Sequence, residues 1–157
     1  MNNKYINIYN NLVNLTRNKD LYKNLPSEDT FSDRLTFFLF HFAFFLKVFK
    51  INNEKNTLQE IYDYVFKQIE LSIREIGYGD VMINKKMKEY INTFHSILNK
   101  IDNWNNLNDA DKSKILTNYL FLNNNTSNLT NYFDKYELLL SKNTLNSLIK
   151  GVIKLKI

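Results

Sequence analysis

One segment of this 157-residue chain, residues 31–49, contains eight of its twelve phenylalanines. At about 100° per residue these rings surround most of a helix, leaving Thr36, Ala43 and Lys47 on its least apolar side. A helix of this kind cannot face water, and the segment therefore predicts the central helix of a bundle. The alternative is that part of its wide apolar face forms a groove for an apolar partner segment.

Residues that break helices are rare in the rest of the chain. It has three Gly and one Pro, and apolar residues recur at helical spacing almost throughout. We therefore expect an all-α fold, a single compact domain over residues 1–157 with about six to seven helices and no strands. The expected helices are residues 3–17, 33–50, 57–76, 84–103, 109–122, 130–140 and 144–156, with a stop at Pro26 and a flexible loop over 123–128.

The helix over residues 57–76 has the clearest pattern. Thr57 can cap its start, with Glu60 at the capping-box position, and one apolar stripe runs from Leu58 to Ile76. Gly77 falls where a helix ends in a left-handed residue. Residues 77–80 then predict a turn before the next helix, expected to begin near Asn84.

Composition removes most enzyme classes. The chain has no Cys and only two His, and no Gly-rich stretch suits a phosphate-binding loop. We therefore expect no metal and no cofactor, and a protein that is not an enzyme. An acid-base enzyme using Asp63, Glu70 or Asp80 is the competing hypothesis.

Arginine is scarce among the cations, with three Arg against 18 Lys and a net charge of +5. Where Lys is the common cation, the three Arg suggest sites that need a planar guanidinium. Arg34 and His41 are seven residues apart, on one stripe with Phe38 and Phe45, so the cation and the imidazole could meet in an apolar setting. A histidine satisfied within the core is the alternative.

The stretch from Ser72 to Asp80 is the densest in unusual residues. Glu70 and Arg74 have the spacing of a helical ion pair, although Arg74 could also simply complement the helix dipole. Three lysines, Lys85, Lys86 and Lys88, follow near the start of the next helix, where the dipole disfavours cations. This basic patch suggests a nearby acid or a partner.

The sequence does not predict a membrane-spanning segment. The longest apolar run, residues 37–46, is shorter than the roughly 18 to 20 residues that cross a bilayer, and the amino terminus lacks a secretory signal. The tail, residues 145–157, is basic and amphipathic. Docking on the core is its common outcome, but the pattern also suits an anionic membrane surface. No nucleic-acid recognition motif is visible.

Two motifs resemble the ubiquinol-cytochrome c chaperone family. The first is Asp29-Thr30 followed by Arg34 and, further on, His41. The second is the run from Arg74 to Asp80, which has the family's Arg-Glu-hydrophobic-Gly-x-Gly-Asp signature. The resemblance covers about residues 9–94, including Pro26, Asp63, Phe66 and the Lys85-Lys86-Met87-Lys88 run.

The resemblance implies a helical, non-enzymatic assembly factor that binds newly made cytochrome b, or its nascent chain, and helps build the ubiquinol-cytochrome c reductase complex. The implied localisation is cytoplasmic, with peripheral association at the inner face of the membrane left open. A basic adaptor at a membrane surface or near the ribosome is the alternative, using the lysine run and the tail. The expected client-binding residues are Arg34, Phe38, His41, Phe45, Arg74, Glu75, Tyr78, Asp80, Lys85, Lys86 and Lys88.

Overall fold

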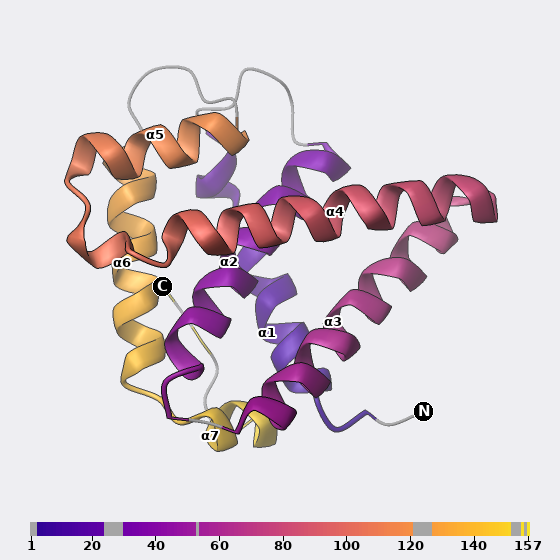
Figure 1. Ribbon diagram of the computed structural model, residues 1–157, viewed down its shortest axis with the longest axis horizontal. Helices are drawn as coiled ribbons and strands as arrows, with labels where there is room; N and C mark the ends of the chain where they lie inside the picture. The colour runs from indigo at the N-terminus through magenta and orange to yellow at the C-terminus, as the bar shows by residue number, and fades with distance from the viewer. Residues whose placement is uncertain (1–2, 24–29, 53, 121–126, 152–154, 156) are drawn as a thin grey trace.

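Helices account for all the regular secondary structure that the computed structural model describes, over residues 3–23, 30–52, 54–120, 127–151, 155 and 157 (Figure 1). This confirms the all-α prediction. The α-helices are α1 (Ile6–Thr16), α2 (Phe31–Phe49), α3 (Lys55–Ile76), α4 (Asp80–Ile101), α5 (Asp109–Leu120), α6 (Ser127–Ser141) and α7 (Leu145–Lys150), and two 3-10 helices are η1 (Lys19–Tyr22) and η2 (Trp104–Asn106).

Helix α2 is the centre of the bundle. It packs against α1, α4, α5 and α6, and Figure 1 shows the other helices arranged around it. Its buried side chains come from every side of the helix: Leu35, Phe37, Phe38, Leu39, Phe40, His41, Phe42, Ala43, Phe44, Phe45 and Phe49. Since burial of one phenylalanine stabilises a fold by about 1.5–3 kcal/mol, this helix dominates the core. The prediction of a central helix is confirmed.

The start of α2 is fixed by a capping box. The Thr30 hydroxyl accepts a hydrogen bond from the Asp33 backbone N–H at 3.1 Å, and the Asp33 carboxylate accepts one from the Thr30 N–H at 3.3 Å. These bonds satisfy two backbone donors that a helix start leaves open. The helix therefore begins at Phe31, two residues before the expected start.

The capping box expected at Thr57 and Glu60 is wrong. Helix α3 begins at Lys55, with Glu54 as its N-cap and no side-chain cap bond. The Glu60 carboxylate instead accepts a hydrogen bond from the Tyr5 hydroxyl of the neighbouring α1 region. The Glu60 side chain is therefore engaged in a tertiary contact with Tyr5 and not in the capping box that the local pattern predicted.

Helices α3 and α4 form a hairpin joined by a very short turn. Gly77 ends α3 in the left-handed conformation, with φ of 104°, as expected. Gly79 is the N-cap of α4, which begins at Asp80 rather than near Asn84. The expected longer loop is therefore wrong, because residues 80–83 already belong to the helix. In Figure 1 this turn lies at one end of the longest axis of the molecule.

The conformation of Gly77 makes a direct prediction for stability. An added Cβ would meet nothing within 4 Å at Gly77 or at Gly79, and only Gly77 has positive φ. We expect Gly77→Ala to lower the free energy of unfolding by about 1–2 kcal/mol through backbone strain. Gly79→Ala is the matched control, expected to change it by less than about 0.5 kcal/mol, because a poorer cap and a stiffer unfolded chain oppose one another. Equal losses in urea unfolding would contradict this account.

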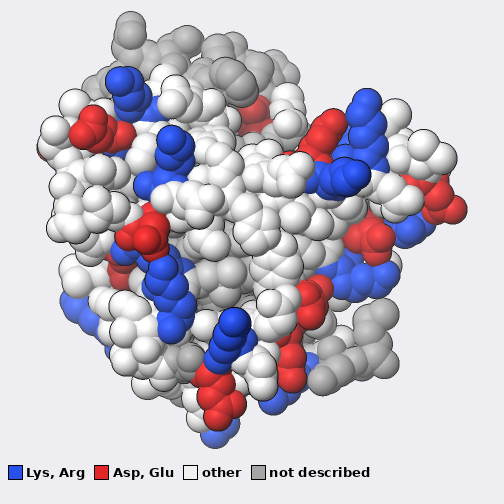
Figure 2. All heavy atoms as spheres, in the orientation of Figure 1, with Lys and Arg blue, Asp and Glu red and all other residues white. Residues whose placement is uncertain are grey.

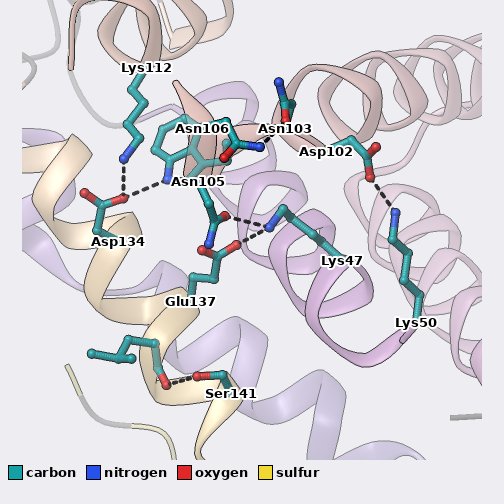
Figure 3. Close-up of polar contacts among 12 residues, drawn as sticks. Lys47, Lys50, Asp102, Asn103, Asn105, Asn106, Lys112, Asp134, Glu137 and Ser141 are labelled. Atoms are coloured by element: carbon teal, nitrogen blue, oxygen red, sulfur yellow. Dashed lines mark hydrogen bonds and ion pairs between the residues drawn. The ribbon is translucent and has the colours of Figure 1, made fainter. Parts of the chain in front are cut away.

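Trp104 joins the second half of the chain to α2. Its indole is fully buried and lies 5.2 Å, between ring centroids, from Phe44. Its Nε1 donates to Asp134 of α6 at 2.8 Å, and the Asp134 carboxylate also binds Lys112 of α5 at 3.1 Å. Beside it, Lys47 of α2 pairs with Glu137 of α6 at 2.5 Å (Figure 3). These contacts fasten α5 and α6 to the central helix.

The C-terminal helix is docked on the core, the common outcome for such a tail. Helix α7 packs on α1, and Leu145, Leu148 and Leu155 are buried. It ends at Lys150, because Gly151 adopts φ of 71°; the expected extension to residue 156 is wrong at this point. Residues 152–154 and 156 lie outside the described residues.

Two expected breaks fall wholly or partly outside the described residues. Pro26 lies outside them, as does most of the expected loop over 123–128, whose last two residues belong to α6. Within the described segments, no helix combines the length and the apolar character required to span a membrane.

Candidate functional site

A groove lies between α1, η1, the first half of α2 and the C-terminal part of α3. Its volume is about 420 Å³, within the range of ligand-binding pockets in general. We call it the α1–α3 groove, defined by its lining: Tyr9, Val13, Thr16, Arg17, Lys19, Tyr22, Phe31, Arg34, Leu35, Phe38, Ile69 and Ser72.

The lining of the groove combines apolar side chains with cations. Leu35, Phe38 and Ile69 are almost fully buried, whereas the Phe31 ring remains 42% exposed. The cations are Arg17, Lys19 and Arg34, so two of the three arginines of the chain lie here. The groove is therefore suited to an apolar segment that also carries an acidic group.

Two polar side chains at the η1 end of the groove are hydrogen-bonded within the protein. The Thr16 hydroxyl donates to the Leu12 carbonyl at 2.8 Å, and the Tyr22 hydroxyl donates to the Thr16 carbonyl at 2.6 Å. The Tyr22 ring also packs edge-on against Phe37, with centroids 5.0 Å apart. This wall is consequently anchored on α1 and α2.

Of the four site residues expected on α2, the structure places two in the groove and two in the core. Arg34 and Phe38 line the groove, while His41 and Phe45 are 0% and 1% exposed. His41 is held within the core, which was the alternative interpretation of this residue. Its Nδ1 lies 2.6 Å from the Phe37 carbonyl and its Nε2 lies 2.7 Å from the Tyr132 hydroxyl.

These hydrogen bonds define the protonation of His41. A carbonyl can only accept, so Nδ1 carries the proton and Nε2 accepts from the Tyr132 hydroxyl. Burial lowers the pKa of His41 from 6.5 to about 4, and the Phe37 carbonyl opposes that shift only in part. The imidazole is therefore neutral at physiological pH and joins α2 to α6.

The remaining expected site residues lie at or near the turn of the α3–α4 hairpin. The Arg74 guanidinium spans this turn, with Nη1 2.7 Å from an Asp80 oxygen and Nη2 3.6 Å from a Glu70 oxygen. The ion pair that their spacing predicts between Glu70 and Arg74 is thus present. Asp80 raises the pKa of Arg74, and the pKa of Glu70 is lowered, first by its hydrogen bond from Lys67.

The signature from Arg74 to Asp80 thus builds a turn. Gly77 supplies the left-handed residue, Gly79 caps the next helix, and the Arg74–Asp80 pair closes the ends. This arrangement leaves apolar side chains in solvent around it: Ile76 is 51% exposed, Tyr78 41%, Val81 86% and Met82 44%. We call residues 76–82 the hairpin tip.

Basic side chains surround the hairpin tip. Lys85 and Lys88 are exposed, and the Lys86 ammonium lies 4.8 Å from the centroid of the Tyr78 ring. Glu75, which immediately precedes the tip, is also exposed. Figure 2 shows both acidic and basic side chains around this end of the molecule, with uncharged surface between them and acidic atoms at its extreme.

The expected site residues therefore divide between two surfaces rather than forming one. Along α3 the surfaces are close, because Ser72 of the groove precedes Ile76 of the tip by about one helical turn. The groove residues Tyr9, Val13 and Phe31 were not expected to contribute to a site. The apolar spacing of Tyr9 and Val13 marks a buried face, and only the fold reveals that part of this face stays open.

The carboxylates of the competing enzyme hypothesis are engaged in surface contacts. Asp63 accepts a hydrogen bond from Gln59 at 2.9 Å, and Glu70 and Asp80 both pair with Arg74. Asp80 retains 82% exposure of its side chain. The pKa of Glu70 is lowered, opposite to the direction that an acid catalyst working near neutral pH requires.

Comparisons with known proteins place the chain in a family. The crystal structure of the Cbp3 homolog from Brucella abortus has a similar fold, with a TM-score of 0.78 and 25% sequence identity over 98% of this chain and 89% of that one. No curated protein matches the sequence. The family model described as ubiquinol-cytochrome C chaperone matches residues 23–152, which include α2 and the whole α3–α4 hairpin. The chain therefore belongs to the ubiquinol-cytochrome c chaperone family.

Proposed function

We propose that the protein is a non-catalytic assembly chaperone for the ubiquinol-cytochrome c reductase complex, and that its client is newly made cytochrome b. The family supports the chaperone role. The α1–α3 groove is the observation that carries the choice of client site, because it combines an open apolar lining with cations. We place the action of the protein at the cytoplasmic side of the membrane into which the client is inserted.

The groove is suited to holding a segment without chemistry. Its volume of about 420 Å³ accommodates a few large side chains rather than a whole helix bundle. Apolar burial against residues such as Phe31 and Phe38 would supply the affinity. The Arg17 guanidinium would select a segment with a nearby carboxylate, because a planar fork binds that group with two parallel hydrogen bonds.

Capture of the client tests this assignment. We expect Phe31→Ser to weaken capture of newly made cytochrome b about tenfold, because a half-exposed ring that becomes buried on binding contributes roughly 1–1.5 kcal/mol. Arg17→Glu should weaken it further by placing a carboxylate at the rim. Both positions are exposed, so the variants should remain folded. The measurement is affinity capture from detergent-solubilised membranes, with pulse-labelled cytochrome b quantified.

The matched control is Leu138→Ser, which removes an apolar side chain of 56% exposure on α6, outside the groove lining. It should capture cytochrome b as the unaltered protein does. Loss of capture with the control, or full capture with both groove variants, would exclude the groove as the client site. In a deletion strain, normal levels of the assembled complex would exclude an essential chaperone role. Co-purification with ribosomes but without cytochrome b would favour the adaptor alternative.

A further inference from the structure

The hairpin tip exposes an apolar cluster that the fold does not use. Of the large apolar side chains that are exposed in the described part of the chain, half lie in residues 76–82, namely Ile76, Tyr78, Val81 and Met82. Val81 is 86% exposed, although it sits on the first turn of a regular helix. Four such side chains within seven residues form a concentrated apolar surface, which marks a contact site more often than scattered apolar residues do.

The lysines near the tip lie behind the apolar cluster, whereas the Asp80 carboxylate, with 82% of its side chain exposed, lies within it and is paired with Arg74. Val81, Lys85 and Lys88 fall on one face of α4, and Met82 and Lys86 fall on the adjacent stripe. Each stripe is therefore apolar at the end of the hairpin and basic one turn further back. Residues 74–88 contain four cations and two carboxylates, a net charge of +2, and one of those carboxylates is paired with Arg74.

This arrangement, with apolar side chains at the tip and lysines one turn behind them, matches the surface of an anionic bilayer. Apolar side chains and a tyrosine ring are stable in the interfacial region, whereas lysines one turn away lie at the level of negatively charged headgroups. The tip also lies at an end of the longest axis of the molecule, free of the other helices in Figure 1. A flat surface could therefore reach it without meeting the rest of the bundle.

We propose that the hairpin tip docks the protein onto an anionic lipid bilayer, with Ile76, Val81 and Met82 entering the interface and Lys85 and Lys86 binding lipid phosphates. The Arg74–Asp80 pair holds the two helix ends together, so that the apolar side chains enter as one unit. This contact is separate from client capture in the groove and does not depend on the identity of the client.

Vesicle flotation with the full chain tests the proposal. The probes are phosphatidylcholine vesicles with and without phosphatidylglycerol. The unaltered protein should float with the anionic vesicles, and Val81→Ser/Met82→Ser should lower the partition coefficient about thirtyfold by removing two apolar side chains from the interface. Lys85→Gln/Lys86→Gln should lower it about tenfold at low salt and weaken its salt dependence.

The control is Ile51→Ser/Leu138→Ser, which removes two apolar side chains of 76% and 56% exposure from another surface. Its binding should equal that of the unaltered protein. Equal losses in the tip and control variants, or no loss in the tip variant, would overturn the proposal. So would unchanged flotation of the tip variant combined with lost cytochrome b capture in detergent, which would make the tip a client surface.

A second measurement locates the contact directly. The chain contains no cysteine, so Val81→Cys and Leu138→Cys each offer one position for a polarity-sensitive fluorophore. Anionic vesicles should shift the emission of the label at position 81 to the blue and leave the label at position 138 unchanged. A shift at position 138 alone, or at neither position, would contradict docking by the hairpin tip.

Discussion

Trp104→Ala is expected to lower the free energy of unfolding by about 4 kcal/mol, a large fraction of the stability of a domain of this size. The indole is fully buried against Phe44, so its removal leaves a cavity at the joint between α2, η2 and α6. The substitution also removes the donor to Asp134, whose carboxylate remains beside Lys112. Urea unfolding followed by circular dichroism measures the loss.

Trp104→Phe separates the two contributions. Phenylalanine keeps most of the apolar volume but cannot donate to Asp134, and we expect a loss nearer 1–2 kcal/mol. If Trp104→Ala and Trp104→Phe had equal effects, the hydrogen bond rather than the packing would account for the role of this residue. A loss below about 1.5 kcal/mol for Trp104→Ala would show that the neighbouring helices can close the cavity.

Acid should destabilise the protein through His41 in a defined pH range. Burial lowers the pKa of the folded imidazole from 6.5 to about 4. Between these values the unfolded chain binds a proton that the folded protein rejects, so this contribution to stability is complete above pH 6.5 and is lost as the pH falls toward 4. The expected loss is about 3 kcal/mol, and below pH 4 it ceases to grow because both states are protonated.

His41→Gln tests the source of this dependence. Glutamine offers a donor and an acceptor but does not titrate, so the difference in unfolding free energy between the two proteins should narrow from pH 7 to pH 4. His95→Gln, which alters the exposed histidine beside Tyr62, is the control and should retain the pH dependence. Two parallel curves for the unaltered protein and His41→Gln would rule out His41 as the titrating group.

The fold class followed from the sequence because its causes are local or compositional. A phenylalanine-rich segment has to be surrounded, and Gly77 has to end a helix, whatever lies elsewhere in the chain. The start of α3 did not follow, since Glu60 is engaged by Tyr5, which lies 55 residues away. The importance of Trp104 was missed for the same reason, because Phe44 and Asp134 reach it from distant parts of the chain.

The site could be predicted only in part. Periodicity places Arg34, Phe38, His41 and Phe45 on one stripe, but it cannot show which part of that stripe another helix covers. Phe38 lines the groove together with residues of α1 and Ile69 of α3. His41, by contrast, is covered by three aromatic side chains of α6, Tyr132, Phe133 and Tyr136. The Arg74–Glu70 pair was visible in the spacing, while the Arg74–Asp80 pair depends on the shape of the turn.

The length of α3 between the groove and the hairpin tip sets the distance between these two surfaces. An α-helix rises about 1.5 Å per residue, so Ser72 and Ile69 lie about 8 and 12 Å along the axis from Gly77. The headgroup layer on one side of a bilayer is roughly 5–8 Å thick. If the hairpin tip docks at that layer with α3 along the bilayer normal, the groove lies just above the headgroups. The groove would then contact loops of the client outside the membrane, while the membrane-spanning segments of the client would remain in the lipid.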